Sequence, residues 1–363
     1  MLSSPAMTHV FVAPHPDDAA LSCGGLILSL RELGQSVTIL TVYSGGPDSI
    51  LDAHDHQRSA LGYGTKTHWP DTEAFDRSNI AAEYPVSTAT AVAPPWQADP
   101  GRIRITQERA NTQARQFWQR AAWTRSANIT NDAHEGRPLP DDVPTQGRLT
   151  RHPLDADDAI AIRKAEDERY AYFAEAALVD LGLPDAVLRG YEHDEAILGR
   201  PVTYDEPPTD ILRREILRLE PQRVYVPLGV GGHVDHRLCR AAALELLAEP
   251  EAWVMPGPDL ASSLAFYEDF PYAWWNGFSD ISNLADDDLE LTPGLALEAR
   301  YCDISDQLER KGAGLRVYAS QMQRLFHDEQ AMLDAVAGYA ARVAQAGGVG
   351  SGAAERYWAV VPT

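Results

Sequence analysis

Two short clusters of histidine and aspartate in the sequence have side chains that could hold a divalent metal ion. Residues 15–18 read His-Pro-Asp-Asp, and residues 233–236 read His-Val-Asp-His. Imidazole nitrogens and carboxylate oxygens are donors that zinc and similar borderline metals accept in proteins. A catalytic zinc site needs three protein ligands and an open position for water, and two histidines with one carboxylate supply that set. The chemistry predicted from these residues is hydrolysis by a metal-activated water.

Each cluster taken alone also has an ordinary structural explanation. An aspartate just before a helix often caps it, so Asp17 or Asp18 could be an N-cap. His233 and His236 could be surface histidines at the start of another helix. The two clusters together favour a shared site, because both are expected to follow buried strands and to meet along one edge of a sheet.

The elements that must position these clusters alternate between strands and helices, as in a doubly wound α/β protein. We expect buried strands at residues 9–13 and 37–43, and a helix at residues 21–33 between them, with Gly34 as its C-terminal cap. The further strands that we predict are at residues 177–181, 223–227 and 264–267, and the further helices are at residues 159–174, 210–219, 234–247, 304–326 and 329–344. The predicted fold class is α/β, with a Rossmann-like, mainly parallel sheet.

A long segment after the second predicted strand lacks this regular alternation. Between Asp48 and Asp157 the periodicity weakens, and only residues 105–123 suggest a helix. We interpret residues 48–157 as a large insertion, either a lid or a surface subdomain. Residues 1–47 and 158–363 would then form the catalytic domain.

Charge and composition restrict the partners of the chain. Its 363 residues carry a formal net charge of -22, which disfavours nucleic acids and anionic membrane surfaces as partners. The three cysteines are far apart and form no Cys-x-x-Cys pair, so neither a disulfide framework nor a thiolate metal site is indicated. No apolar run approaches the roughly 20 residues of a membrane span. We expect a cytoplasmic protein without a membrane span.

The two clusters and several further blocks resemble the LmbE/PIG-L family of de-N-acetylases. This family includes enzymes that remove acetyl groups from N-acetylglucosamine-containing substrates. The further blocks that resemble one bacterial branch of the family lie at residues 163–167, 183–186, 227–236, 267–272 and 318–321. The resemblance covers about residues 8–47 and 159–325, and it implies an LmbE-like fold.

The resemblance also implies roles for individual residues. It implies that three residues bind zinc: His15, Asp18 and His236. Fe²⁺ or another divalent metal is also compatible with this ligand set. Asp17 would act as the general base, a protonated His233 would polarise the carbonyl or stabilise the oxyanion, and Asp235 would orient a histidine. Adjacent aspartates suit this division, because the base must lie next to the ion that lowers the pKa of water.

By the same resemblance, Arg163 and Asp185 would hold sugar hydroxyls. An ion pair between Arg163 and Glu166 on a helix surface is an equally good explanation of the arginine. Residues 267–269 could line the pocket or simply end a strand. Two features depart from the family: residues 48–157 match no family block, and Gly231 stands where some relatives carry an aromatic residue that reaches the substrate.

The predicted function is zinc-dependent removal of the N-acetyl group from an N-acetylglucosamine-type sugar or glycoconjugate. One alternative is an amidase that acts on another acyl amide or on a thiol conjugate. Another is a carbohydrate-binding relative without catalysis, although the presence of Asp17 speaks against it, since metal binding alone would not require this residue. The expected partner is a small amino-sugar or glycoconjugate substrate.

Overall fold

The fold is described from a computed structural model, which covers residues 7–46, 67–68, 156–191, 194–202, 205–248, 263–275, 291–350 and 352–363. Its strands are β1 (Thr8–Ala13), β2 (Ser36–Thr41), β3 (Thr67–His68), β4 (Ala177–Asp180), β5 (Arg223–Pro227), β6 (Leu264–Tyr267), β7 (Leu295–Asp303) and β8 (Ala354–Pro362). They form one eight-stranded sheet in the order β3-β4-β2-β1-β5-β6-β8-β7. The five adjacent strands β4, β2, β1, β5 and β6 are parallel to one another. Strands β3, β8 and β7 are antiparallel to their neighbours. The α/β, mainly parallel fold predicted from the sequence is confirmed.

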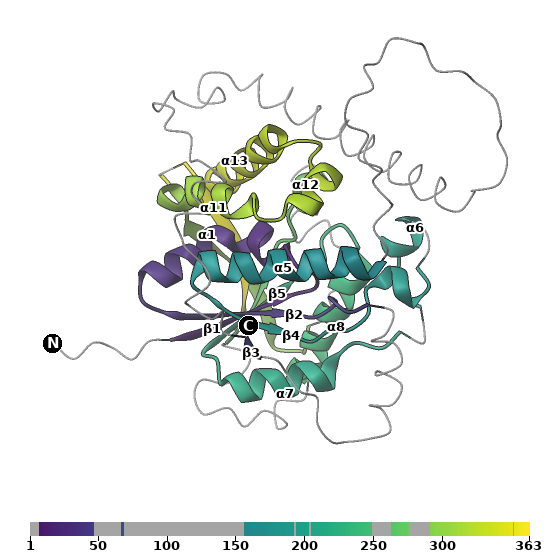
Figure 1. Cartoon of the computed structure of the whole chain (residues 1–363). Coiled ribbons are helices and arrows are strands. Elements are labelled where there is room, and N and C mark those ends of the chain that lie inside the picture. Colours follow the sequence, from purple (N-terminus) through teal and green to yellow (C-terminus); the bar gives the residue numbers. More distant parts are fainter. Residues whose placement is uncertain are drawn as a thin grey trace, which may run out of the picture.

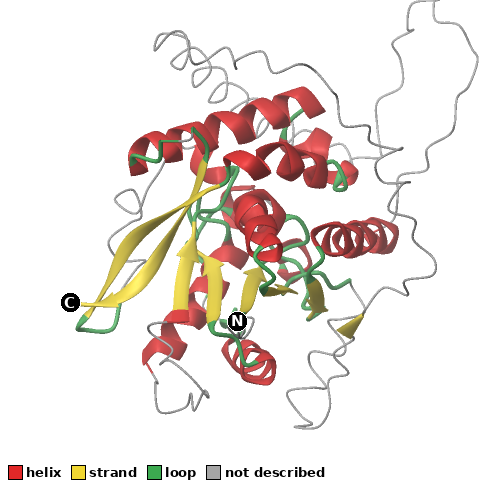
Figure 2. Cartoon of the chain, turned by 90° about the vertical axis from the view of Figure 1, so that its left-hand side faces the viewer, coloured by secondary structure: helices red, strands yellow, loops and turns green. Residues whose placement is uncertain are grey.

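Helices cover both faces of the sheet, which Figures 1 and 2 show from two directions. The longer helices are α1 (Asp18–Glu32), α5 (Ala156–Ala174), α7 (Thr209–Leu219), α8 (Val234–Ala248), α11 (Leu308–Leu315), α12 (Ala319–Leu325) and α13 (Glu329–Gly347). Shorter turns are η2 (Ala186–Arg189), α6 (Asp194–Ile197), α10 (Tyr272–Trp275) and η6 (Ser305–Gln307). Helices α1, α5 and α11 pack against one another on one side, and α7 and α8 pack together on the other.

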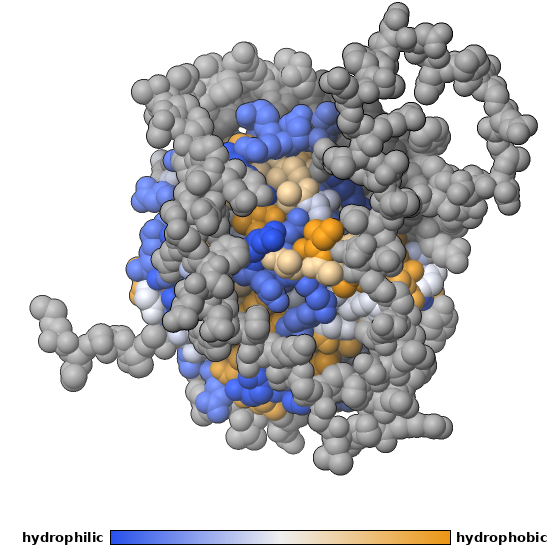
Figure 3. Space-filling view, in the orientation of Figure 1, coloured by the Kyte–Doolittle hydropathy of each residue, from blue (hydrophilic) through white to orange (hydrophobic). Residues whose placement is uncertain are grey.

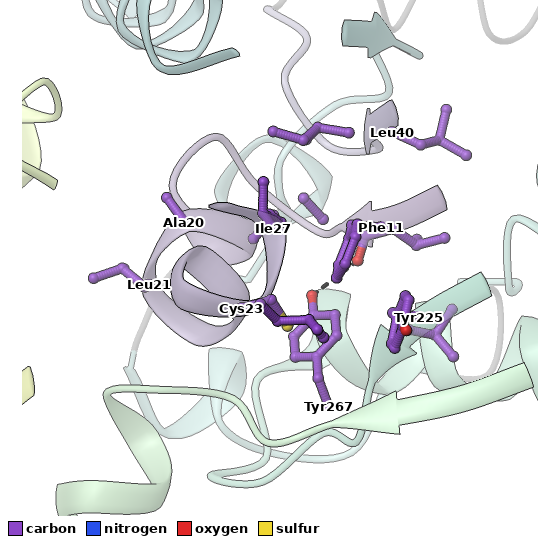
Figure 4. Packing of buried hydrophobic residues seen from close by; sticks show 14 of the residues in the cluster. Phe11, Ala20, Leu21, Cys23, Ile27, Leu40, Tyr225 and Tyr267 are labelled. Carbon is purple, nitrogen blue, oxygen red and sulfur yellow. Dashed lines mark hydrogen bonds between the residues drawn. The ribbon is translucent and has the colours of Figure 1, made fainter. Parts of the chain in front are cut away.

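The centre of the core lies between α1 and the inner strands (Figure 4). Phe11 and Leu40 on adjacent parallel strands are fully buried, as is Ile27 on the helix that crosses them. Strands buried on both faces need apolar side chains on both faces, which explains the nearly continuous apolar run of β1. In this region the hydroxyl of Tyr267 donates a hydrogen bond to the carbonyl oxygen of Val12 at 2.8 Å.

The sheet order brings the candidate residues to one edge. Strand β1 lies in the middle, and the chain continues to β2 and β4 on one side of it and to β5 and β6 on the other. Where the order in which the chain visits the strands reverses in this way, a crevice opens at the carboxyl ends of the strands, and ligands bind there in open α/β sheets. The His-Pro-Asp-Asp turn follows β1 at this edge, and the loop that ends at His233 follows β5.

The C-terminal part differs from the prediction in two respects. The prediction of a single helix over residues 304–326 is wrong, because the helix is interrupted at residues 316–318, between α11 and α12. This break lets the hydroxyl of Tyr318 donate to Asp167 and lets Ser320 donate to Glu166. The antiparallel pair β7 and β8 was not predicted at all. Its sheet faces are only partly buried, so it lacks the continuous apolar run by which the parallel strands were found.

The predicted insertion at residues 48–157 lies outside the described residues, except for β3 and the first two residues of α5. The helix expected at residues 105–123 also lies outside them. Within the described part of the chain, no helix combines the length and apolar character that a membrane crossing needs. Hydrophilic and hydrophobic residues are interspersed over the described part of the face in Figure 3.

Candidate metal-binding active site

The two aspartates in the turn between β1 and α1, Asp17 and Asp18, make different contacts. Asp17 precedes α1, but its side chain makes no capping hydrogen bond, and its backbone adopts a φ of 98°. A positive φ is uncommon for a residue other than glycine and costs roughly 1–3 kcal/mol. The Oδ2 atom of Asp18 accepts a hydrogen bond from the backbone N–H of His15 at 2.8 Å. The capping explanation of these aspartates is therefore wrong, since neither side chain caps the helix.

Three buried side chains from the two clusters converge on one point. Asp18 Oδ2 lies 3.1 Å from Nδ1 of His15 and 3.3 Å from Nε2 of His236. Potential ligand atoms of these three residues all lie within 4.8 Å of one another. Among the described residues, the fully buried Nε2 of His236 makes no hydrogen bond of good geometry, although the carboxylate of Asp18 is close to it. An imidazole nitrogen left in this way fits a site built for a metal ion.

A second set with similar spacing consists of His15, His233 and Asp235. The carboxylate of Asp235 already has several partners in the protein. Its Oδ2 atom lies 2.8 Å from Nε2 of His15 and accepts from the backbone N–H of Ala186, while its Oδ1 atom accepts from Arg189 at 2.5 Å. This carboxylate therefore has the contacts of a residue that orients His15, and the set with Asp18 fits a metal better.

The sequence offered Asp269 as a residue that lines the pocket or ends a strand, and the structure gives it a different contact with the site. Its Oδ1 atom lies 2.5 Å from Nδ1 of His236, and its Oδ2 atom accepts from the backbone N–H groups of Gly229 and Val230. The fully buried carboxylate thus holds the ring of His236 with Nε2 directed at Asp18, and it also holds the loop that leads to His233. Its position in the sequence could have indicated a place in the site, because Asp269 follows β6 at the same edge of the sheet as the two clusters.

The adjacent aspartates have pKa shifts of opposite direction. Burial, and then the charge of Asp18, raise the pKa of Asp17 to about 7. Burial also opposes ionisation of Asp18, but His236 and His15 outweigh it and hold the pKa of Asp18 well below its usual value. Asp18 is therefore a permanent carboxylate, whereas Asp17 can take up and release a proton near neutral pH.

The surroundings of His233 disfavour the protonated form expected from the sequence. Burial, and then the neighbouring charge of His15, lower the pKa of His233 well below its usual value. The backbone N–H of Asp235 donates to Nδ1 of His233 at 3.2 Å, so the single ring proton of the neutral form belongs on Nε2. In this form His233 still provides one N–H donor to the cavity.

Arg163 and Asp185, which the resemblance predicts to bind substrate, lie close together at the cavity wall. The Nη1 atom of Arg163 lies 3.5 Å from Oδ2 of Asp185. Glu166 does not form the predicted helix-surface pair with Arg163 in any described contact. It is buried and accepts from the backbone N–H and the hydroxyl of Ser320 at the start of α12.

A cavity of about 290 Å³ opens over the cluster. Its polar lining includes His15, Asp17, Asp18, Arg163, Asp185 and His233. Its apolar and aromatic lining includes Leu21, Ile160, Val187, Leu188, Tyr272 and Trp275. A concave site with apolar walls and a few convergent polar groups is the usual form of a small-molecule site. None of residues 267–269 lines it. Tyr267 donates to Val12, Glu268 binds Tyr339, Arg356 and Trp358, and Asp269 contacts His236 behind the cavity wall.

Comparison with known proteins connects this site to deacetylases. The family model described as PIG-L, GlcNAc-PI de-N-acetylase, matches residues 10–76. The 2′-N-acetylparomamine deacetylase of Streptomyces fradiae is 32% identical over 163 residues, which are 44% of this chain and 53% of that protein. The match thus covers about half the length of this curated relative.

Solved structures show the same fold over almost the whole chain. The A40926 pseudoaglycone deacetylase Dbv21 superposes with a TM-score of 0.53 at 19% identity, over 99% of this chain and 98% of that chain. A zinc-inhibited form of the teicoplanin deacetylase Orf2 gives a TM-score of 0.52 at 18% identity, over 98% of both chains. The matched N-terminal segment and the curated relative confirm the resemblance to the LmbE/PIG-L family expected from the sequence, and the solved structures show the same fold.

Proposed function

We propose that the protein is a metal-dependent hydrolase that removes the N-acetyl group from an N-acetylglucosamine-type sugar or glycoconjugate. The observation that carries this proposal is the buried convergence of His15, Asp18 and His236 beneath the cavity, with Asp17 beside them. Three ligands suit a catalytic metal with an open position, and a carboxyl group whose pKa is near 7 suits a general base. We assign the ion as zinc, although Fe²⁺ or another divalent ion fits the same ligands.

The residues would divide the work as follows. An ion held by His15, Asp18 and His236 supplies Lewis acidity, which polarises the amide carbonyl and lowers the pKa of water. Asp17 would accept a proton from the attacking water and later pass it to the leaving amine. The Nε2–H of neutral His233 would donate a hydrogen bond to the developing oxyanion. Asp235 would hold His15 in place from behind.

The sugar substrate is supported by the relatives and by the cavity. The relative in Streptomyces fradiae is a deacetylase of 2′-N-acetylparomamine, and the solved neighbours are deacetylases of A40926 pseudoaglycone and of teicoplanin. In this chain, Arg163 and Asp185 at the cavity wall offer a donor and an acceptor for hydroxyl groups of a sugar. We propose that these two side chains bind the polyol part of the substrate.

Acetate release from a panel of N-acetylated amino sugars tests the proposed function. The panel contains N-acetylglucosamine, a disaccharide of it and an N-acetylated aminocyclitol glycoside, and the enzyme is loaded with zinc. Release of one acetate per amide cleaved from at least one of them is expected. Absence of acetate release together with cleavage of a longer acyl amide or a thiol conjugate would favour an amidase of different acyl specificity. Binding of the sugars without any cleavage would favour a non-catalytic relative.

A further inference from the structure

Gly231, in the loop before His233, leaves room for the side chain of Tyr272. Its φ is +87°, and a Cβ atom added there would lie 2.5 Å from Cβ of Tyr272 and 2.8 Å from the first atom of the Tyr272 ring. Real Cβ atoms do not approach that closely, and a positive φ is strained for any other residue. The glycine therefore allows Tyr272 to lie directly against the loop that carries His233.

Tyr272 occupies a central place in the wall of the cavity. Its ring lies edge-on to that of His236, with the centroids 5.5 Å apart, and 6.2 Å from that of His233. On its other side it meets the ring of Trp275 at 5.6 Å, again nearly perpendicular. Both aromatic residues line the cavity and are partly exposed. Tyr272 and Trp275 thus form an aromatic wall of the cavity next to the candidate catalytic histidines.

The segment that carries this wall is held firmly in place. Ala273 donates to the carbonyl oxygen of Asp269, while Trp274 and Trp275 donate to the carbonyl oxygen of Pro271, so α10 is a closed turn. Phe270 is buried and its backbone N–H donates to the hydroxyl of Ser22 on α1. Because Asp269 also holds His236, one short segment fixes both a metal-site histidine and the aromatic wall beside it.

We propose that Tyr272 and Trp275 form an aromatic subsite that receives the apolar C–H face of the saturated ring bearing the amide. This inference rests on the proposed function, and it names the part of the substrate that the site selects: a sugar or cyclitol ring rather than an open-chain amide. Aromatic rings offer a large, rigid apolar surface, and polar groups such as Arg163 and Asp185 fix the orientation of the ligand. Gly231 is then a specificity-determining position, because its missing side chain places Tyr272.

The test compares a ring substrate with an acyclic one of similar polarity. N-acetylglucosamine and N-acetylethanolamine are offered to the zinc-loaded wild type, to Tyr272→Leu, to Trp275→Leu and to Tyr272→Phe. Loss of one aromatic contact should raise the KM for N-acetylglucosamine by about 2- to 12-fold with kcat little changed. The KM for N-acetylethanolamine should stay the same, and Tyr272→Phe should restore the low KM for N-acetylglucosamine that Tyr272→Leu loses, because the ring rather than the hydroxyl makes the contact.

Binding measurements keep this inference separate from the proposed reaction. Calorimetric titration of zinc-loaded Asp17→Asn, with and without Tyr272→Leu, gives the affinity for both compounds without turnover. Weaker binding of N-acetylglucosamine alone in the double variant supports the aromatic subsite even if the wild type cleaves neither compound. Equal affinities in the two variants, or no binding of the ring compound by Asp17→Asn, would overturn the subsite. The absence of acetate release with the subsite intact would instead contradict the proposed function.

Gly231→Ala provides an independent test with a matched control. The added methyl group must displace Tyr272, so this variant should lose selectivity for the ring as Tyr272→Leu does. Gly34→Ala introduces a methyl group at a φ of +72° with no atom within 4 Å, far along the chain from the site. It should show the cost of the backbone conformation alone, with unchanged selectivity. If the two alanine variants select between the compounds equally well, Gly231 does not act through Tyr272.

Discussion

Asp17 and Asp18 are neighbours in the chain and equally buried, yet their surroundings separate their chemistry. Asp18 contacts two histidines, which stabilise its negative charge. Asp17 lies next to that negative charge and away from water, so its pKa rises to about 7. Pairs of groups whose environments push their pKa values apart are the usual source of acid and base roles. The resemblance to the LmbE/PIG-L family implies this division of roles, and the opposite pKa shifts of the two aspartates are consistent with it.

Matched amide variants at these two positions should therefore fail in different ways. Asp17→Asn should retain the metal and lose about 10²- to 10⁴-fold in kcat, since a general base contributes about that factor. Asp18→Asn should lose metal, because it removes a charged ligand. Metal analysis by mass spectrometry, beside the rate of acetate release, distinguishes the two. Full activity of Asp17→Asn, or loss of metal from it equal to that of Asp18→Asn, would refute the assignment.

Among the described residues, Asp269 contacts the site through His236 and the loop at Gly229 and Val230, so its effect should appear in metal affinity. Replacing a carboxylate that orients a metal-binding histidine typically lowers metal affinity by 10- to 100-fold. Asp269→Asn should show such a loss in competition with a coloured chelator, and excess zinc should restore much of its activity.

Glu268→Gln is the matched control for Asp269→Asn. It disturbs the adjacent buried carboxylate, which binds Arg356 and Tyr339 instead of a site residue. This variant should be less stable, with its metal affinity unchanged. Equal metal affinities in Asp269→Asn and the wild type would show that His236 does not depend on Asp269.

At the scale of elements, the helices and strands that could be predicted from the sequence are those with a strong local pattern of apolar residues. The parallel strands are continuous apolar runs, and their ends carry the clusters, so both the sheet and the meeting of residues 15–18 with residues 233–236 could be expected. The break between α11 and α12 could not, because it depends on distant partners: Tyr318 reaches Asp167, and Ser320 reaches Glu166 on α5. The contacts of Asp269 and Tyr272 likewise depend on how β6 pairs with β5, which no local pattern reports.

Strand β1 contains a buried histidine that should make stability depend on pH. His9 is 5% exposed, its ring stacks at 6.1 Å on that of Tyr225, and neither ring nitrogen has a hydrogen-bond partner among the described residues. Burial, and then the charge of Arg223, lower its pKa to about 4. The unfolded chain binds a proton at His9 below about pH 6.5, whereas the folded chain does not until about pH 4. Stability is therefore lost as the pH falls through this window.

Urea unfolding between pH 4 and pH 7.5 measures the contribution of His9. His9→Phe keeps an aromatic ring but cannot bind a proton, so its free energy of unfolding should fall less steeply below pH 6.5 than that of the wild type. Parallel pH profiles for the wild type and His9→Phe would rule out a folded-state shift at His9.

At the scale of the whole molecule, the doubly wound sheet gathers the site from segments far apart in the chain. Residues 15–18, Asp185, His233 and Asp269 follow four different parallel strands and meet because those strands end at one edge. Strands β2 and β4 pair directly in parallel, although a long segment separates them in the sequence. We propose on this basis that residues 1–47 and 158–363 form the catalytic domain and that residues 48–157 are an insertion in it.

The central claim is that metal held by His15, Asp18 and His236 makes this protein a deacetylase. It is tested most directly by titrating metal-free protein with zinc and measuring, in the same samples, bound metal and acetate released from an N-acetylated amino sugar. We predict that acetate release rises in proportion to bound zinc, reaches its maximum at about one ion per chain, and stays absent in Asp18→Asn. Undiminished acetate release by the metal-free protein, or none at full zinc occupancy, would contradict the account.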